Sequence, residues 1–240
     1  MSAPRRVRHA VVVDTAAVTP AMRRIVLGGP DVATLTVPAG ALGPYVKLHF
    51  AACGGRDLVR TYSVRSYDAR RGELHLDILL HGDDGPGSRF GAVARPGDAV
   101  RLGGPGFIPA EPCGSYLLAG DHTALPAIAH ILESLPAHVR ARAFIEVPGT
   151  SEEQDLRSAA AVEISWLHRP HGAPSRLADA VRAGWPDDRQ DVLVWAGAEA
   201  VAARAIRAQA RAVGHAAPGR CQVLNYWKAG QPEGGFSYVD

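Results

Sequence analysis

The chain has 240 residues, of which 47% are hydrophobic and 21% are charged, as in an ordinary globular protein. Its 26 lysines and arginines nearly balance its 24 acidic residues, so it lacks the broad basic face that bulk nucleic-acid binding requires. The length suits one large domain or two modest ones.

The three cysteines, Cys53, Cys113 and Cys221, are far apart and form no Cys-x-x-Cys pair, which fits a reducing compartment. The apolar run after the basic start is too short for a signal-peptide core. No stretch of the sequence reaches membrane-spanning length. We therefore expect a cytoplasmic protein without membrane insertion.

The first hundred residues contain six short runs rich in β-branched residues, separated by clusters of Gly, Pro and Asp. The runs are 7–13, 24–27, 46–50, 61–66, 73–80 and 99–102. Such spacing predicts an antiparallel barrel or sandwich, with one short helix inserted at 88–93. Alternation within 73–80 predicts that Leu74, Leu76 and Ile78 face the core.

After about residue 111, strands and helices alternate. We predict strands at 116–119, 141–147, 163–167, 191–196 and 220–226, and helices at 124–135, 177–183 and 200–213. This order is typical of a parallel sheet covered by helices. We place a domain boundary at 111–114, which predicts an all-β domain over 1–112 and an α/β domain over 113–240.

The peptide 60–66, Arg-Thr-Tyr-Ser-Val-Arg-Ser, is the most informative part of the first half. As a strand it puts Arg60, Tyr62 and Val64 on one face and the intervening residues on the other. A planar, anionic cofactor can use an aromatic ring, a hydroxyl and a guanidinium fork, and a flavin dinucleotide fits that description. The alternative is an edge strand with solvated arginines, which is the commoner interpretation of such a peptide alone.

A glycine-rich stretch at 82–90 leads from a predicted strand into the short helix. Glycines let the backbone approach a ligand, and the helix start presents unpaired amides, so the stretch predicts a phosphate cradle with Ser88 as a cap. The alternative is a plain glycine-rich turn. Asp83 and Asp84 oppose phosphate binding unless they turn outward.

The segment 116–128 predicts a strand, a tight turn and a helix start, with Thr123 as the N-cap and Pro126 in the first turn. Ligands of open α/β sheets lie beyond the carboxyl ends of the strands, where this turn is placed. The Gly-x-Gly-x-x-Gly fingerprint is absent, so a nicotinamide cofactor would need another loop chemistry. The turn 197–199 repeats the arrangement, and the alternative for both is a well-capped turn.

Metal and hydrolase chemistry are not expected. His168 and His171 are close in sequence, but Pro170 lies between them and no third ligand is evident. No Gly-x-Ser-x-Gly elbow is present. After the last predicted strand, two aromatic residues precede Lys228, a cation that can face a ligand.

The peptide 60–65 resembles the Arg-x-Tyr-Ser/Thr flavin motif of the ferredoxin-reductase superfamily, and 11–230 resembles the siderophore-interacting proteins, flavin-dependent ferric-siderophore reductases. The resemblance lies in five parts in order: 46–48, 60–65, 81–88, 118–128 and 226–230. It implies a six-stranded antiparallel flavin-binding β-barrel followed by a parallel NAD(P)-binding-like α/β domain.

The resemblance also implies roles for individual residues. FAD would be held by Arg60, Thr61, Tyr62, Ser63, His81, Gly85, Gly87 and Ser88, with Tyr62 and Ser63 at the isoalloxazine as the catalytic contacts. The nicotinamide cofactor would be lined by Gly120, Asp121, Thr123, Ala124, Gly197 and Glu199. Lys47 and Lys228 would meet the anionic ferric siderophore.

Two departures from the family pattern stand out. His122 takes a position that is commonly acidic, and we hypothesise that it joins Lys47 and Lys228 in attracting the chelate. The run 103–107, Gly-Gly-Pro-Gly-Phe, lacks the arginine of the common Gly-Pro-Arg-Gly-Ser-like run, which puts a phosphate contact from that loop in doubt.

The expected function is transfer of electrons from NADPH or NADH through FAD to a ferric siderophore, with release of Fe(II). The alternatives are a broader NAD(P)H:flavin or ferredoxin-type reductase, with ferredoxin as a partner, and a non-catalytic siderophore- or flavin-binding protein. The sequence leaves the nicotinamide open, because Glu146 suits a ribose whereas Arg140, Arg142 and Arg169 suit a 2′-phosphate.

Overall fold

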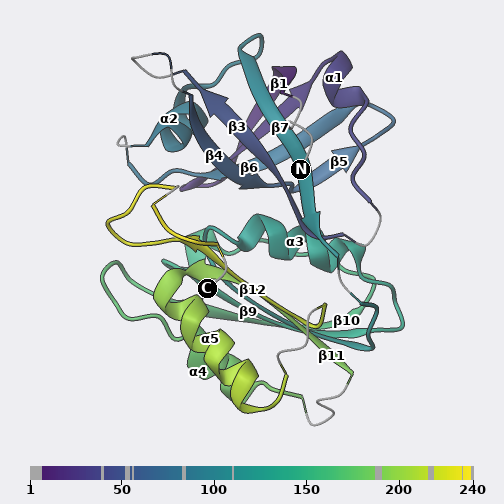
Figure 1. Cartoon of the computed structure of the whole chain (residues 1–240), viewed down its shortest axis with the longest axis vertical. Helices are drawn as coiled ribbons and strands as arrows, with labels where there is room; N and C mark the ends of the chain where they lie inside the picture. The colour runs from purple at the N-terminus through teal and green to yellow at the C-terminus, as the bar shows by residue number, and fades with distance from the viewer. Residues whose placement is uncertain are drawn as a thin grey trace. The chain divides into compact units, whose positions relative to one another are not determined.

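A computed structural model describes residues 7–38, 41–51, 55, 57–82, 85–109, 111–186, 191–215, 219–233 and 235–238. The chain divides into two compact units, Met1–Phe107 and Ile108–Asp240 (Figure 1). The predicted domain boundary at 111–114 lies a few residues after this division. Cys53, Asp83 and Asp84, which the sequence analysis singled out, lie outside the described residues.

The first unit is built on a seven-stranded antiparallel sheet in the order β4-β3-β7-β1-β2-β6-β5. Its strands are β1 Arg8–Thr19, β2 Met22–Gly28, β3 Leu42–Phe50, β4 Leu58–Ser63, β5 Ser66–Asp68, β6 Glu73–Leu79 and β7 Ala99–Ile108. Two helices, α1 Pro30–Ala33 and α2 Pro86–Val93, occupy connections between strands. Helix α2 was predicted, whereas the single turn of α1 was not.

The predicted count of six strands is wrong, because the single strand predicted at 61–66 corresponds to two strands, β4 and β5. The segment 58–68 pairs with β3 through β4 and with β6 through β5. Between them, Val64 N donates to Pro44 O (2.7 Å) and Arg65 N donates to His75 O (2.9 Å). The two outer strands of the sheet, β4 and β5, are therefore consecutive in the chain. Only Val64 and Arg65 lie between them, so this short connection links the two edges of the sheet.

The core of the first unit confirms the alternation predicted for β6. Leu74, Leu76 and Ile78 are buried in one apolar cluster. On the opposite face of the same strand, the carboxylate of Asp77 accepts two hydrogen bonds from Arg24, at 2.7 and 2.8 Å. This bidentate pairing satisfies a carboxylate that burial would otherwise penalise.

The second unit contains a parallel five-stranded sheet in the order β10-β9-β8-β11-β12, as the α/β pattern predicted. Its strands are β8 Ser115–Asp121, β9 Arg140–Val147, β10 Ala161–His168, β11 Val192–Glu199 and β12 Cys221–Trp227. Its helices are α3 Leu125–Ser134, α4 Leu177–Ala183 and α5 Ala200–Ala212, with a 3₁₀ turn, η1, at Thr150–Glu152.

Helices cover both faces of this sheet (Figure 1). Helices α4 and α5 pack on one face, where Val181 and Ile206 join the strand residues Leu117 and Val194 in a buried cluster. Helix α3 covers the other face. Within the described ranges, no helix is long and apolar enough to span a membrane.

Candidate functional site

The peptide 60–66 places Tyr62 beside the start of α2. The pairing of β3 with β4 sets Tyr62 opposite Val46 and Arg60 opposite Leu48. Directly opposed residues point to the same face, and Val46 and Leu48 are fully buried there. Tyr62 is half-buried and packs against the same core cluster.

The hydroxyl of Tyr62 lies directly on the first turn of α2. A Cβ atom added to Gly87 would lie 1.6 Å from Tyr62 Oη, so only glycine permits this approach. The helix has Gly85 as its N-cap, and its first bond runs from Arg89 N to Gly85 O (3.0 Å). The amides of Gly87 and Ser88 precede that bond and belong to the helix start, where anions bind.

Ser88 does not cap the helix, contrary to the prediction. Its hydroxyl is buried, donates to Gly82 O (2.7 Å) and accepts from His81 N (3.1 Å). The side chain thereby ties the glycine loop to the helix. His81 packs near Gly85, whose added Cβ would lie 3.4 Å from the imidazole carbon Cε1.

The remaining predicted residues of this strand divide between two faces. Lys47 lies opposite Thr61, and Tyr45 lies opposite Ser63. These four residues therefore share the face that Tyr62 does not use. Arg60 Nη1 donates to the carbonyl of Val59 (2.8 Å), a neutral partner that leaves the guanidinium charge in place.

In the second unit, the carboxylate of Asp121 joins three strand ends. Oδ1 accepts from Thr123 N (3.0 Å) and Thr123 Oγ1 (2.5 Å). Oδ2 accepts from Glu199 N and from Trp227 Nε1, both at 2.8 Å. Asp121 is only 5% exposed, so its side chain serves as an anchor that positions the surrounding loops.

Glu199 continues this network toward the end of the chain. Its Oε2 accepts from Val201 N (2.6 Å), which caps α5, and its Oε1 accepts from Ala229 N (3.3 Å). The second bond holds the backbone next to Lys228. Trp227, the last residue of β12, was not among the predicted site residues. Its indole N–H can only donate, so a buried acceptor near the strand end could have been expected.

The turn after β8 differs in detail from the prediction. The N-cap of α3 is Ala124, without a side-chain cap, because the Thr123 hydroxyl is bound to Asp121. Gly120 permits close packing of α3, since an added Cβ would lie 2.7 Å from Ala124 Cβ and 2.9 Å from Ile128 Cδ1. Gly197 similarly admits the ring of Tyr226, whose Cε1 would lie 2.7 Å from an added Cβ.

His122 does not suit the role we hypothesised for it. It is 7% exposed, and its Nε2 lies 3.2 Å from Glu152 Oε2. Burial lowers the pKa of His122, and this effect outweighs the opposing influence of Glu152 and Asp121. A buried imidazole beside a carboxylate presents no cation to an anionic chelate.

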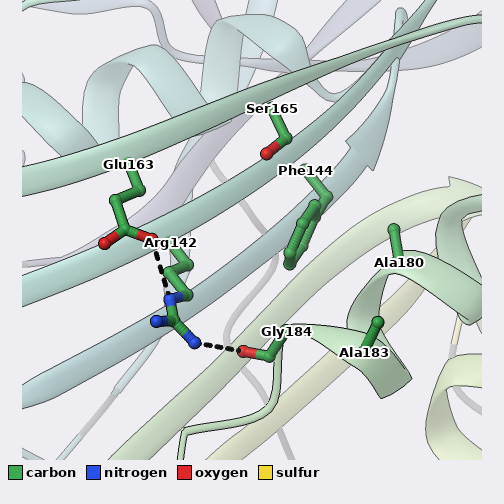
Figure 2. Close-up of a pocket in the computed structure, with 7 residues that line it drawn as sticks. All are labelled: Arg142, Phe144, Glu163, Ser165, Ala180, Ala183 and Gly184. Carbon is green, nitrogen blue, oxygen red and sulfur yellow. Dashed lines mark hydrogen bonds and ion pairs between the residues drawn. The ribbon is translucent and has the colours of Figure 1, made fainter.

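A shallow depression of about 320 Å³ lies between β9, β10 and α4 (Figure 2). It is lined by Arg142, Phe144, Glu163, Ser165, Ala180, Ala183 and Gly184. These strand residues lie in the first half or middle of β9 and β10, before the carboxyl ends. Of the residues that the sequence analysis considered for a ligand, the lining includes Arg142 and none of the flavin, nicotinamide or siderophore candidates.

The architecture of both units is that of a ferredoxin-reductase-like fold. A ferredoxin NADP⁺ reductase from Neisseria gonorrhoeae has a similar structure, with a TM-score of 0.68 at 13% identity over 92% of this chain and 99% of that one. At this identity the likeness defines the fold alone.

Closer relatives define the family. Residues 113–230 match the siderophore-interacting protein model, and 51–108 match the siderophore-interacting FAD-binding domain model. The siderophore-interacting protein SipS from Aeromonas hydrophila is 31% identical, with a TM-score of 0.85 over 96% of this chain and 94% of that one. The ferric vibriobactin reductase ViuB of Vibrio cholerae is 32% identical over 178 residues, 72% of this chain and 66% of that protein. The chain belongs to the siderophore-interacting protein family.

The Asp121 network predicts the effect of Asp121→Asn. An amide NH₂ would face a donor, Glu199 N–H or Trp227 Nε1–H, and we expect a loss of about 2–3 kcal/mol in the free energy of unfolding of the second unit. All four tryptophans lie in that unit, so urea unfolding followed by tryptophan fluorescence reports on it. Asp179→Asn is the control, since it removes an exposed carboxylate. Equal stability of the two variants would contradict the anchoring role.

The lowered pKa of His122 predicts a pH dependence. Below its ordinary value of 6.5, the unfolded chain takes up a proton that the folded chain resists, so this contribution to stability is present above pH 6.5 and is lost as pH falls. We expect His122→Gln to flatten the decline in unfolding free energy of the second unit between pH 7 and the acidic range. The exposed His171→Gln should retain the wild-type slope, and matching slopes for all three proteins would refute the interpretation.

Proposed function

We propose that this protein is an FAD-dependent reductase that transfers electrons from a nicotinamide nucleotide to a ferric siderophore. The observation that carries the proposal is the close approach of the Tyr62 hydroxyl to Gly87 in the first turn of α2. An aromatic ring beside a helix start is what a flavin dinucleotide needs, because the ring supports the flavin and the helix start attracts its phosphates.

The residues present fit FAD. Because Gly87 has no side chain, the Tyr62 hydroxyl can lie against the helix start, where the amides of Gly87 and Ser88 precede the first helical bond. The guanidinium of Arg60, on β4, is bonded to the neutral carbonyl of Val59. Its charge and its planar set of N–H donors can therefore serve a phosphate. The buried Ser88 hydroxyl would support the loop, while its amide would meet the phosphate.

When bound, FAD accepts a hydride from a nicotinamide and passes single electrons to ferric iron. The chain's own contribution is binding and orientation. In the second unit, the turns after β8 and β11 are held at fixed positions by Asp121, and we propose that their backbone at Gly120, Thr123, Ala124 and Gly197 lines the nicotinamide nucleotide.

The substrate half of the proposal rests on relatives and on two cations. The Vibrio cholerae relative bears the name of a ferric vibriobactin reductase, and the Acinetobacter baumannii relative that of a ferric acinetobactin reductase. Ferric siderophores with hard oxygen donors are commonly anionic. We assign their attraction to Lys47, half-buried on β3, and Lys228, after β12, whereas the buried His122 has no part in it.

The cradle predicts FAD binding that depends on Gly87. We expect the purified protein to bind FAD with a flavin absorption band, and Gly87→Ala to weaken FAD binding at least about tenfold, because the new methyl displaces Tyr62 from the helix. Val93→Ala, at an exposed position of the same helix, is the matched control. Circular dichroism of each apoprotein verifies folding. Failure of the wild-type protein to bind FAD would overturn the proposal.

The lysines predict a separable effect on the substrate. We expect Lys47→Ala and Lys228→Ala each to raise the KM for a ferric chelate several-fold while FAD affinity stays unchanged, since each removes one cation from the surface. The measurement is Fe(II) formation with an Fe(II) indicator under anaerobic conditions. Loss of FAD instead would move the lysine concerned to the cofactor site, and binding of the chelate without any reduction would favour a non-catalytic carrier.

A further inference from the structure

The parallel sheet of the second unit has two edge strands, β12 and β10. The C-terminal segment is bonded to the first of them, because Asn225 N donates to Tyr238 O (2.9 Å) and Asn225 Nδ2 donates to Ser237 O (2.8 Å). Within the described ranges, no segment of the chain forms backbone hydrogen bonds with the outer side of β10. Such an edge presents a row of free N–H and C=O groups to another chain.

The outward groups of β10 follow from its hydrogen bonds with the neighbouring strand. Ala161 N donates to Val139 O (3.3 Å) at the start of β10, and Arg169 N donates to Val147 O (2.8 Å) directly after its end. Because backbone groups alternate in direction along a strand, the odd-numbered residues face β9 and the even-numbered residues face outward. The free N–H and C=O groups are therefore those of residues 162, 164 and 166.

This strand lacks the features that commonly protect an edge. It contains no lysine or proline, and its pairing with β9 runs through all eight residues without a bulge. Its one acidic residue, Glu163, is bonded sideways to Arg142 of β9 (3.0 Å). The charge of Glu163 is thus balanced within the same sheet and adds little repulsion toward a strand that approaches the edge.

The side chains of β10 are self-complementary about Ile164. Val162, Ile164 and Trp166 are half-buried and share one face. Glu163 and Ser165 are exposed on the other face, beside the depression in Figure 2. Two copies that pair in antiparallel fashion with Ile164 opposite its own copy set Val162 opposite Trp166. The same register sets Glu163 opposite Ser165, so each residue meets one of its own kind, and an aromatic ring meets a β-branched side chain.

The backbone supports the same register. Outward residues of one copy meet outward residues of the other, so each such pair exchanges N–H···O=C bonds in both directions. The neighbouring registers fit less well. With Ile164 opposite Trp166, the carboxylate of Glu163 meets Leu167. With Ile164 opposite Val162, Glu163 meets its own copy, and like charges directly opposite each other destabilise a sheet.

We infer that β10 is the contact surface of a symmetric dimer, in which the parallel sheets of two copies of this chain join edge to edge. The symmetry is two-fold, so the contact closes on itself and ends at two chains. Pairing of one strand from each chain buries less surface than a standard stable interface, and we expect a dissociation constant of about 10–100 µM. This association does not depend on the flavin chemistry proposed above.

Mass measurement on the full chain tests the dimer directly. We expect sedimentation velocity to show the 25.3 kDa monomer at low concentration and growth toward twice that mass between about 1 and 500 µM. Ile164→Lys sets two ammonium groups opposite each other and should weaken dimerisation at least about tenfold. A mass that stays at 25.3 kDa at every concentration, or one that grows beyond two chains, would overturn the inference.

Ser165→Lys is the matched control, because it adds the same charge one residue further along the strand. In the inferred register its ammonium lies opposite the partner's Glu163, so the dissociation constant should stay the same or fall. Circular dichroism verifies that both lysine variants fold. An equal loss of dimer in the two variants would contradict the inferred pairing.

Disulfide formation gives a second test that does not rely on weakening the contact. Ile164→Cys places two thiols opposite each other across the two-fold axis, at a Cα separation of about 5.5 Å that a disulfide can span. We expect oxidation to link this variant into a covalent dimer on a non-reducing gel, while Ser165→Cys, whose thiol does not meet its own copy, stays near the background. The wild-type chain sets that background for the three native cysteines. Equal crosslinking of the two variants, or none for Ile164→Cys, would refute the register.

Discussion

The buried carboxylate of Asp121 is the interaction on which the ends of three strands of the second unit depend. It accepts from two groups of Thr123, from Glu199 N and from Trp227 Nε1, and so joins the ends of β8, β11 and β12. Burial of a charge is costly unless donors surround it, and four donors do so here. The same bonds hold the turns in place, which would reduce the ordering that binding of the proposed nicotinamide nucleotide requires.

In the first unit, steric fit fixes the position of a side chain against a helix start. Tyr62 rests on the first turn of α2 because Gly87 has no side chain, and the Ser88 hydroxyl fixes the preceding loop through Gly82 and His81. Both units thus place a helix start next to a strand end. In one unit a carboxylate network fixes the geometry, and in the other the absence of a Cβ atom does.

Much of the fold could be predicted because its patterns are local. Alternation in β6 marked Leu74, Leu76 and Ile78 as core residues, and α4 begins and ends where the sequence predicted. Apart from the strand count, the errors concern side chains whose partners or burial depend on the surrounding structure. Thr123 and Ser88 are good helix caps by type, yet each binds a nearer group, and His122 proved buried beside Glu152.

By itself the sequence determined most of the order of strands and helices, the change from an all-β to an α/β pattern, and the motif on which FAD binding is proposed, because periodicity and turn chemistry act over a few residues. It did not reveal α1 or the division between β4 and β5. Tertiary structure alone decided which groups meet across the sheet. Asp121 and Trp227 are 106 residues apart, and Glu146 and Arg176 are 30 apart. Such contacts depend on strand order and register, and these turned the Glu146 side chain into the protein and left β10 at an edge of the sheet.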